Sequence, residues 1–88
     1  MIVQIDRSFV KDAERIKDQR LLNRIAYYIN QVIDADSLDR IHSVKKMKGE
    51  TNYYRIRIGD YRIGLRADRD SVIFIRVLHR KEIYKYFP

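Results

Sequence analysis

The chain has no cysteine and no tryptophan, and it has only one proline and three glycines. The absence of cysteine excludes a disulfide framework and a thiolate metal site, and it agrees with the cytoplasmic location that we expect. Long apolar runs are also missing, since the longest series of aliphatic and phenylalanine side chains is residues 72–75. A membrane-spanning helix needs about 20 apolar residues, so neither a span nor a secretory signal is predicted.

Acidic residues are scarce in the second half of the chain. Residues 1–42 carry seven Lys or Arg and seven Asp or Glu, whereas residues 43–88 carry twelve and five. The whole formal net charge of +7 therefore lies in residues 43–88. This asymmetry favours a polyanion, an acidic protein partner, or both. A basic surface that serves only solubility is the alternative.

The composition and the periodicity of the chain predict one α+β domain that covers residues 1–88. A hydrophobic content of 45% is too high for a disordered chain. Apolar residues recur at helical spacing in two segments near the N-terminus. Alternating segments with short connections follow, and short connections make neighbouring strands antiparallel. The predicted elements are strands at 1–5, 44–49, 53–58, 61–67 and 72–78, helices at about 8–18 and 20–34, and a short helix or turn at 80–88.

These elements predict an antiparallel sheet of four to five strands packed against an N-terminal helical hairpin, with a short C-terminal helix. Either Asp6 or Ser8 is a suitable N-cap for the first helix. The two amphipathic helices cover the apolar face of the sheet in this prediction, and the other face stays free. The aspartates of the 34–43 loop lack the glycine turn and the bidentate glutamate of a calcium loop, so we expect neither a metal nor another cofactor.

The stretch YYRIRIGDYRI (53–63) predicts a hairpin with a two-residue turn at Gly59-Asp60. This turn fixes the register, so the isoleucines and Leu65 lie on one face and arginines lie on the other. Like charges directly opposite each other destabilise a hairpin, which a bound anion relieves. Arginine also binds phosphate with two hydrogen bonds, where lysine acts as a point charge. The residues expected on the polar face are Tyr53, Arg55, Arg57, Arg62 and Arg66, with Gly64 leaving room for close approach to the backbone.

The register of the last strand decides where Arg76 lies. An odd-numbered loop after residue 67 puts Ile73, Ile75 and Val77 on the core face and Arg76 on the basic face. An even-numbered loop puts Arg76 among the isoleucines, so we expect the odd loop. Arg80 then continues the basic side to the end of the sheet.

Two stretches, KKMKGETNYYRIRIGDYRIGL (45–65) and VIFIRVLHRKEIYKYF (72–87), together resemble the RelE/ParE superfamily of toxins from type II toxin–antitoxin systems, and most closely its RelE branch. The resemblance implies a ribosome-dependent endoribonuclease that cuts mRNA in the A site. The 2′-hydroxyl attacks the adjacent phosphate without a metal, and translation is inhibited. It also implies three partners: a cognate acidic antitoxin protein, the ribosome with its rRNA, and mRNA.

The resemblance also implies roles for single residues. Arg55 and Arg57 match two basic residues that are usually lysines in the family, and Arg62 matches an arginine that binds phosphate. Arg80 matches an arginine assigned to the transition state or leaving group, and Tyr84 matches a tyrosine that stacks on or orients the base. The residues expected to contact RNA or the ribosome are Lys45, Lys46 and Lys48 on the basic strand, with Arg66 and Arg76 on the sheet.

The sequence departs from the family scheme at the general base. A lysine can serve as the base in RelE toxins, but a guanidinium at Arg55 or Arg57 almost never deprotonates. His79 is the nearby group that titrates close to neutral pH, and it is our candidate base, with a structural role at the strand end as the alternative. Two other functions stay open: a ParE-type poison of DNA gyrase, and a non-catalytic basic RNA-binding module.

Overall fold

The structure, a computed structural model, describes residues 1–49 and 51–88. Its elements are β1 (Ile2–Ile5), α1 (Arg7–Glu14), α2 (Gln19–Asp34), the 3₁₀ turn η1 (Leu38–Arg40), β2 (Val44–Lys46), β3 (Tyr53–Ile58), β4 (Tyr61–Asp68), β5 (Ser71–His79) and α3 (Ile83–Tyr86). They form a five-stranded sheet in the order β1-β5-β4-β3-β2. β1 runs parallel to β5, and the other neighbouring strands are antiparallel. The predicted α+β class with a mainly antiparallel sheet is confirmed.

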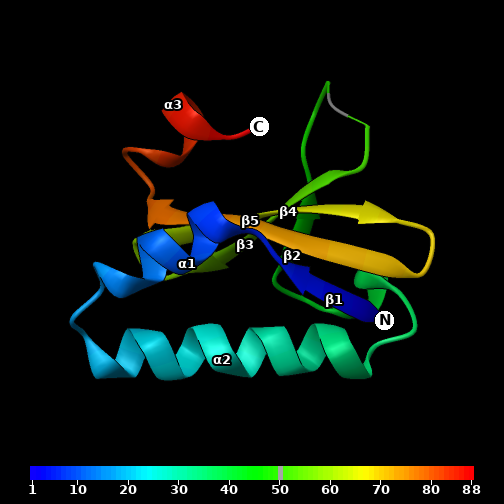
Figure 1. Ribbon diagram of the computed structural model, residues 1–88. Helices are drawn as coiled ribbons and strands as arrows, with labels where there is room; N and C mark the ends of the chain where they lie inside the picture. The colour runs from blue at the N-terminus through cyan, green and yellow to red at the C-terminus, as the bar shows by residue number, and fades with distance from the viewer. Residues whose placement is uncertain (50) are drawn as a thin grey trace.

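Helix α2 packs its apolar stripe against one face of the sheet, as Figure 1 shows. Leu21, Ile25 and Val32 of α2 are buried against strand residues that alternate along β3, β4 and β5. The strand side of this core consists of Ile56, Ile58, Ile63, Leu65, Val72, Phe74 and Val77. None of the helices in residues 1–49 and 51–88 is long and apolar enough to cross a membrane.

The β3–β4 hairpin has the register predicted from its turn. Ile58 pairs with Tyr61 and Arg57 pairs with Arg62 across a turn in which Gly59 has a φ of 56°. A positive φ at this position is the reason that glycine suits the turn. The isoleucines therefore point to α2, and the arginines lie on the opposite face of the sheet.

The prediction for β5 was right for Arg76 and wrong for the two isoleucines. The loop between β4 and β5 has an even number of residues, not the odd number that was predicted, because Asp68 lies opposite Ser71. Ile73 is therefore not in the core. A bulge in β5 then shifts the register. Leu65 pairs with Phe74, but its neighbour Gly64 pairs with Arg76 and not with Ile75. Ile75 is the extra residue. After the bulge Arg76 lies on the same face as the hairpin arginines, and Val77 is buried in the core as expected.

Helix α1 contributes Phe9 to the core but runs along the edge of β5, beyond the end of β1. Asp6 is its N-cap, and hydrogen bonds from the Ser8 hydroxyl and amide lower the pKa of the Asp6 carboxyl. The Ser8 hydroxyl also donates to the Ile75 carbonyl at 2.8 Å, and the Val77 amide donates to Asp12 Oδ2 at 3.1 Å. These contacts satisfy backbone groups on the edge of β5 beyond the end of β1.

The sequence had suggested that the face of the sheet opposite α2 is free, and this prediction was wrong. The C-terminal tail (residues 80–88) turns back over it after β5, with α3 on the opposite side of the sheet from α2 (Figure 1). Ile83 and Phe87 of this tail are buried, at 1% and 3% exposure. The tail thus covers part of the arginine surface instead of leaving the whole face open.

Candidate functional site

The arginine face is the side of the sheet that carries Arg55, Arg57, Arg62, Arg66 and Arg76. Across its strands Lys45 lies opposite Arg55, and Arg57 lies opposite Arg62. Such like-charged pairs destabilise a sheet unless an anion or a carboxylate compensates them. Within the described residues no carboxylate lies within 4 Å of Arg55, Arg57 or Arg62. In the free protein these three positive charges are therefore not neutralised by a carboxylate among the described residues.

Arg62 is the most unusual member of the arginine face because it is buried, at 7% exposure. Its Nη1 donates to the carbonyls of Gly59 at 2.7 Å and Tyr61 at 2.8 Å, which folds the side chain back over the hairpin turn. Burial lowers the pKa of Arg62, and the positive charges of Arg57 and Arg55 lower it further. A guanidinium held in one orientation, without an acidic partner, is suited to hydrogen bonding with a phosphate group.

Tyr84 reaches this cluster from the C-terminal tail. Arg55 Nη1 donates a hydrogen bond to the Tyr84 hydroxyl, and the Arg55 guanidinium carbon lies 6.0 Å from the centre of the tyrosine ring. The ring is exposed, so one face of it remains accessible to a base. The structure therefore brings together the arginines of the hairpin and the tyrosine that the sequence had placed in the same site.

The tail is fixed above the sheet by Phe87. Its ring packs edge-on against Tyr53, with 5.5 Å between the ring centres, and it lies directly on Gly64. A Cβ atom at Gly64 would be 2.6 Å from two carbon atoms of this ring. The space at Gly64, which the sequence predicted as room for a close approach, is occupied by the protein's own tail.

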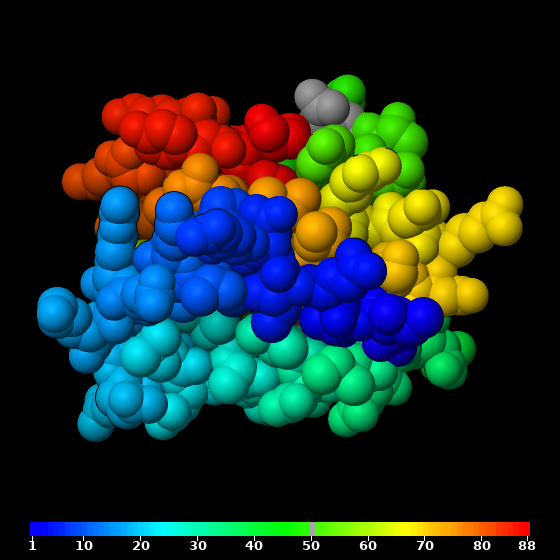
Figure 2. All heavy atoms as spheres, in the orientation of Figure 1, coloured from blue at the N-terminus to red at the C-terminus, as the bar shows by residue number. Residues whose placement is uncertain are grey.

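Two hollows flank Arg55, and basic residues line both. One is lined by Lys46, Met47, Lys48, Arg55 and Tyr84, and the other by His42, Ser43, Lys45, Arg55 and Arg57. Figure 2 shows the tail (red) and the segment that leads into β3 (green) on the same side of the molecule. The three lysines of the basic strand thus border the arginine cluster. His42 was not predicted here, because its place beside the arginines depends on how the 34–43 loop folds.

The remaining predicted arginines have different surroundings. The Arg80 amide donates to the Asp60 carbonyl at 2.7 Å, so Arg80 lies at the hairpin turn, and its charge contributes to the lowered pKa of Arg62. Arg66 is exposed and lies opposite Tyr53, where it borders a separate hollow with Asp68.

Arg76 is bound by Asp12 through two hydrogen bonds, of 2.7 and 3.0 Å, which raises the pKa of Arg76. Arg76 is therefore not available to RNA in the way that Arg57 is.

The expectation that His79 lies among the arginines is wrong. His79 pairs with Tyr61, and its ring packs edge-on against the Tyr61 ring at 5.6 Å, on the side of the sheet that faces α2. The Lys81 amide donates to His79 Nδ1 at 3.1 Å, so that nitrogen is already occupied as an acceptor. In the part of the chain that the structure describes, no three His, Asp or Glu side chains form a group that could hold a metal ion.

Comparison with known proteins agrees with this geometry. Residues 3–84 match the family model described as the ParE toxin of the type II toxin–antitoxin system parDE. Over 89 aligned residues the chain is 45% identical to toxin RelE3 of Methanocaldococcus jannaschii, and the alignment covers 100% of both proteins.

Solved structures show the same fold. The crystal structure of the RelB–RelE antitoxin–toxin complex from Methanococcus jannaschii matches with a TM-score of 0.82 and 44% identity, over 97% of this chain and 99% of that one. The archaeal RelE–RelB complex from Pyrococcus horikoshii matches with a TM-score of 0.74 and 19% identity, over 93% and 97% of the two chains. The full-length match at 45% identity and the family match over residues 3–84 lead to one conclusion. The chain belongs to the RelE/ParE family of toxins from type II toxin–antitoxin systems.

Proposed function

We propose that this toxin is a ribosome-dependent endoribonuclease that cuts mRNA in the A site and thereby inhibits translation. The observation that carries the proposal is the cluster of Arg55, Arg57 and Arg62 without a carboxylate partner among the described residues, with the Tyr84 hydroxyl held at its rim. Metal-free RNA cleavage needs cations that stabilise the pentacoordinate phosphate and a group that moves the 2′ proton. The cluster supplies the first of these directly.

The reaction proceeds by attack of the 2′-oxygen on the adjacent phosphorus. The new bond joins the 2′-oxygen to phosphorus, and the bond from phosphorus to the 5′-oxygen of the next nucleotide breaks. A base accepts the 2′ proton and an acid protonates the 5′-oxygen, so the products are a 2′,3′-cyclic phosphate and a 5′-hydroxyl. Arg62, with its fixed orientation, holds the non-bridging oxygens, while Arg57 and Arg80 add positive charge as the phosphate gains negative charge.

The proton transfers are assigned to groups on the arginine face. His79 lies on the other side of the sheet with Nδ1 occupied, so it is replaced in this scheme by His42 and Tyr84. His42 lines the hollow beside Arg55 and Arg57, and an imidazole can act as a general acid or base. The Tyr84 hydroxyl already accepts a hydrogen bond from Arg55, which leaves its own proton free for donation to an oxygen.

Lys45, Lys46 and Lys48 extend the positive surface away from the cluster and are proposed to contact rRNA. They are exposed on and just after β2, an edge strand. Phosphate contacts from lysines position a protein on RNA without reading its sequence. Arg66 has the same role at the other end of the arginine face.

The regulating partner is proposed to be an acidic antitoxin, as in the two RelB–RelE complexes whose structures match this chain. A protein with a formal net charge of +7, concentrated in residues 43–88, offers strong charge complementarity to such a partner.

The deciding experiment uses purified toxin, ribosomes programmed with a defined mRNA, and mapping of RNA ends. Cleavage inside the A-site codon that leaves a 5′-hydroxyl, and no cleavage of the same RNA without ribosomes, is the expected result. The family model carries the name ParE, so a DNA gyrase cleavage assay is run in parallel. Trapped gyrase–DNA complexes with intact mRNA would assign the ParE activity, and binding to RNA without cleavage would assign a non-catalytic module.

A further inference from the structure

Three residues in one row across the sheet lie under the C-terminal tail. Arg55 on β3 pairs with Gly64 on β4, and Gly64 pairs with Arg76 on β5. Each of the three meets an aromatic ring of the tail: Tyr84 contacts Arg55, Phe87 lies on Gly64, and Tyr86 lies over Arg76, whose guanidinium carbon is 5.4 Å from the ring centre. The tail therefore crosses three adjacent strands at a single level of the sheet.

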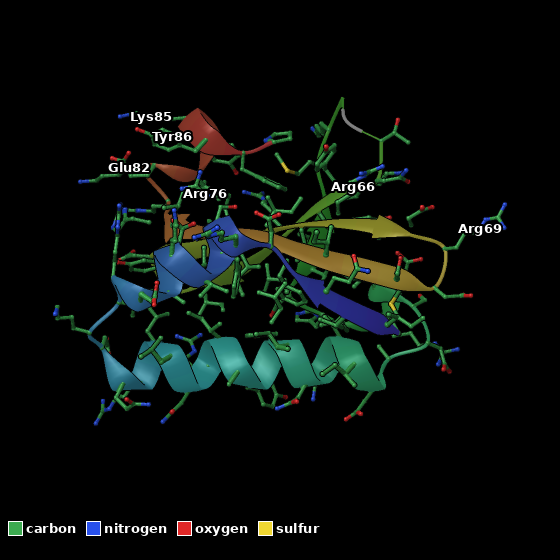
Figure 3. The ribbon with its side chains drawn as sticks, viewed as in Figure 1. Arg66, Arg69, Arg76, Glu82, Lys85 and Tyr86 are labelled. Carbon is green, nitrogen blue, oxygen red and sulfur yellow. The ribbon has the colours of Figure 1, made fainter. Side chains whose placement is uncertain are left out.

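The two Arg–Tyr contacts act on different sides of α3. Successive residues of an α-helix are about 100° apart, so Tyr84 and Tyr86 point in nearly opposite directions. One ring reaches toward β3 and the other toward β5, and Figure 3 shows Arg76 rising from the sheet toward Tyr86. The two contacts lie on opposite sides of a four-residue helix, and they add to the hold of the buried anchors Ile83 and Phe87 on its rotation about its own axis.

The two arginines of the row differ in what else binds them. Arg76 Nε and Nη2 donate to the two carboxylate oxygens of Asp12, which is 5% exposed and also accepts from the Val77 amide. Asp12 thus holds the Arg76 side chain in one position and neutralises it. Arg55 has no carboxylate within 4 Å among the described residues, so it remains free to bind an anion.

We propose that Asp12, Arg76 and Tyr86 are positioning residues for the cleavage reaction. Asp12 fixes Arg76, Arg76 fixes the Tyr86 ring, and the resulting rotation of α3 holds the Tyr84 hydroxyl against Arg55. Arg76 acts as part of the scaffold and makes no contact with RNA. The inference rests on the proposed function for its kinetic consequence, while its structural part concerns the placement of Tyr84 in the toxin alone.

The test replaces Tyr86, because its side chain is 57% exposed and its loss leaves the buried anchors intact, whereas removal of Asp12 threatens folding. Tyr86→Leu removes the ring, Tyr86→Phe keeps it, and Tyr27→Leu removes a tyrosine of equal exposure, 57%, from α2. We expect Tyr86→Leu to lower the single-turnover cleavage rate roughly three- to tenfold, with unchanged ribosome affinity. Tyr86→Phe and Tyr27→Leu are expected to stay within about twofold of the unmodified toxin, because both keep the stack on Arg76.

A double-variant comparison separates positioning from general stabilisation. If Tyr86 acts through Tyr84, Tyr86→Leu has less than about a twofold effect once Tyr84→Ala is present, since coupled residues are not additive. An equal loss in both backgrounds, or a loss in Tyr86→Phe as large as in Tyr86→Leu, would overturn the inference.

A readout without ribosomes keeps the result separate from the proposed function. In toxin with ¹³C-labelled tyrosines, Tyr86→Leu is expected to shift the NMR ring signals of Tyr84, and Tyr27→Leu is not. An unchanged Tyr84 signal in Tyr86→Leu contradicts the inference even where this variant cleaves more slowly. If the Tyr84 signals shift in Tyr86→Leu but the unmodified toxin cleaves no mRNA, the positioning contact is supported and the proposed function is rejected.

Discussion

The ring of Phe87 lies on the backbone of Gly64 so closely that no side chain fits between them: three of its carbons are 2.6–2.7 Å from the position of a Cβ. The Phe87 ring therefore reaches the backbone of the sheet because residue 64 lacks a side chain. A glycine in the middle of a strand weakens it, and here the weakness is offset by the burial of Phe87.

Gly64→Ala is expected to displace the tail. The added methyl clashes with the Phe87 ring on one side and is fixed to β4 on the other, so the free energy of unfolding should fall by about 1–3 kcal/mol, as in overpacked cores. Cleavage by ribosome-bound toxin should fall at least about tenfold, because Tyr84 moves with the tail. Chemical denaturation and the A-site cleavage assay measure the two effects.

The control for this prediction is the same change in a Phe87→Ala background. With the ring removed, the methyl at residue 64 has no clash to relieve, so Gly64→Ala should cost much less there than in the unmodified toxin. Equal costs in both backgrounds would mean that the alanine disturbs the sheet itself.

The second prediction concerns the geometry of Arg62. Arg62→Lys keeps the charge but loses the planar fork and the fixed orientation over the hairpin turn. We expect the single-turnover rate to fall roughly 100- to 1,000-fold, the range for losing one preorganised donor, while ribosome affinity stays within about twofold. Arg66→Lys is the matched control, an exposed arginine on the same face. Similar rates for both variants would indicate that the face acts only as a positive surface.

The sequence predicted those parts of the fold that short-range signals specify. The β3–β4 register follows from a two-residue turn, and the apolar stripe of α2 follows from its periodicity. The β5 bulge could not be predicted in this way. Beside it, the Ile75 carbonyl and the Val77 amide bond to Ser8 and Asp12, more than 60 residues away in the chain. The parallel pairing of β1 with β5 is a similarly long-range feature.

The same distinction applies to the candidate site. The arginines and Tyr84 were predicted together, because strand alternation and the family motifs indicate them. Strict alternation from the buried Val77 also puts His79 on the core side, away from the arginines. The place of His42 and the Asp12–Arg76 pair depend on how separate segments meet, so no local pattern indicates either of them.

The third prediction compares the replacement of His42 and of His79 by glutamine. His42→Gln should lower the cleavage rate by about a hundredfold, the scale of general acid–base catalysis. His79→Gln, the matched control, should stay within about threefold, because its ring packs on Tyr61 away from the arginine face. The reverse result would return His79 to the mechanism. Normal rates in both variants would leave Tyr84 or a ribosomal group as the base.

Removal of the Asp12 carboxylate is expected to destabilise the toxin. Asp12→Ala leaves the Arg76 guanidinium without its partner and the Val77 amide without its acceptor. Breaking such a buried pair lowers the free energy of unfolding by about 3 kcal/mol. Glu14→Ala, an exposed acidic residue on the same helix, should change it by less than about 0.5 kcal/mol. Urea titrations compare the two, and equal values would show that Asp12 contributes nothing beyond its charge.

The last prediction concerns capture by the antitoxin. Association of an acidic chain with this basic surface should be steered by long-range charge, so its rate constant should fall steeply between 50 and 500 mM salt, roughly tenfold or more. Arg57→Gln, at the centre of the arginine face, should slow association about threefold at low salt. Arg69→Gln provides the matched loss of one charge, because Arg69 projects from the tip of the β4–β5 loop, away from the sheet (Figure 3). Stopped-flow mixing with the co-expressed acidic partner measures both. Identical slowing by the two variants would mean that only net charge steers the encounter, and that the antitoxin does not approach the arginine face first.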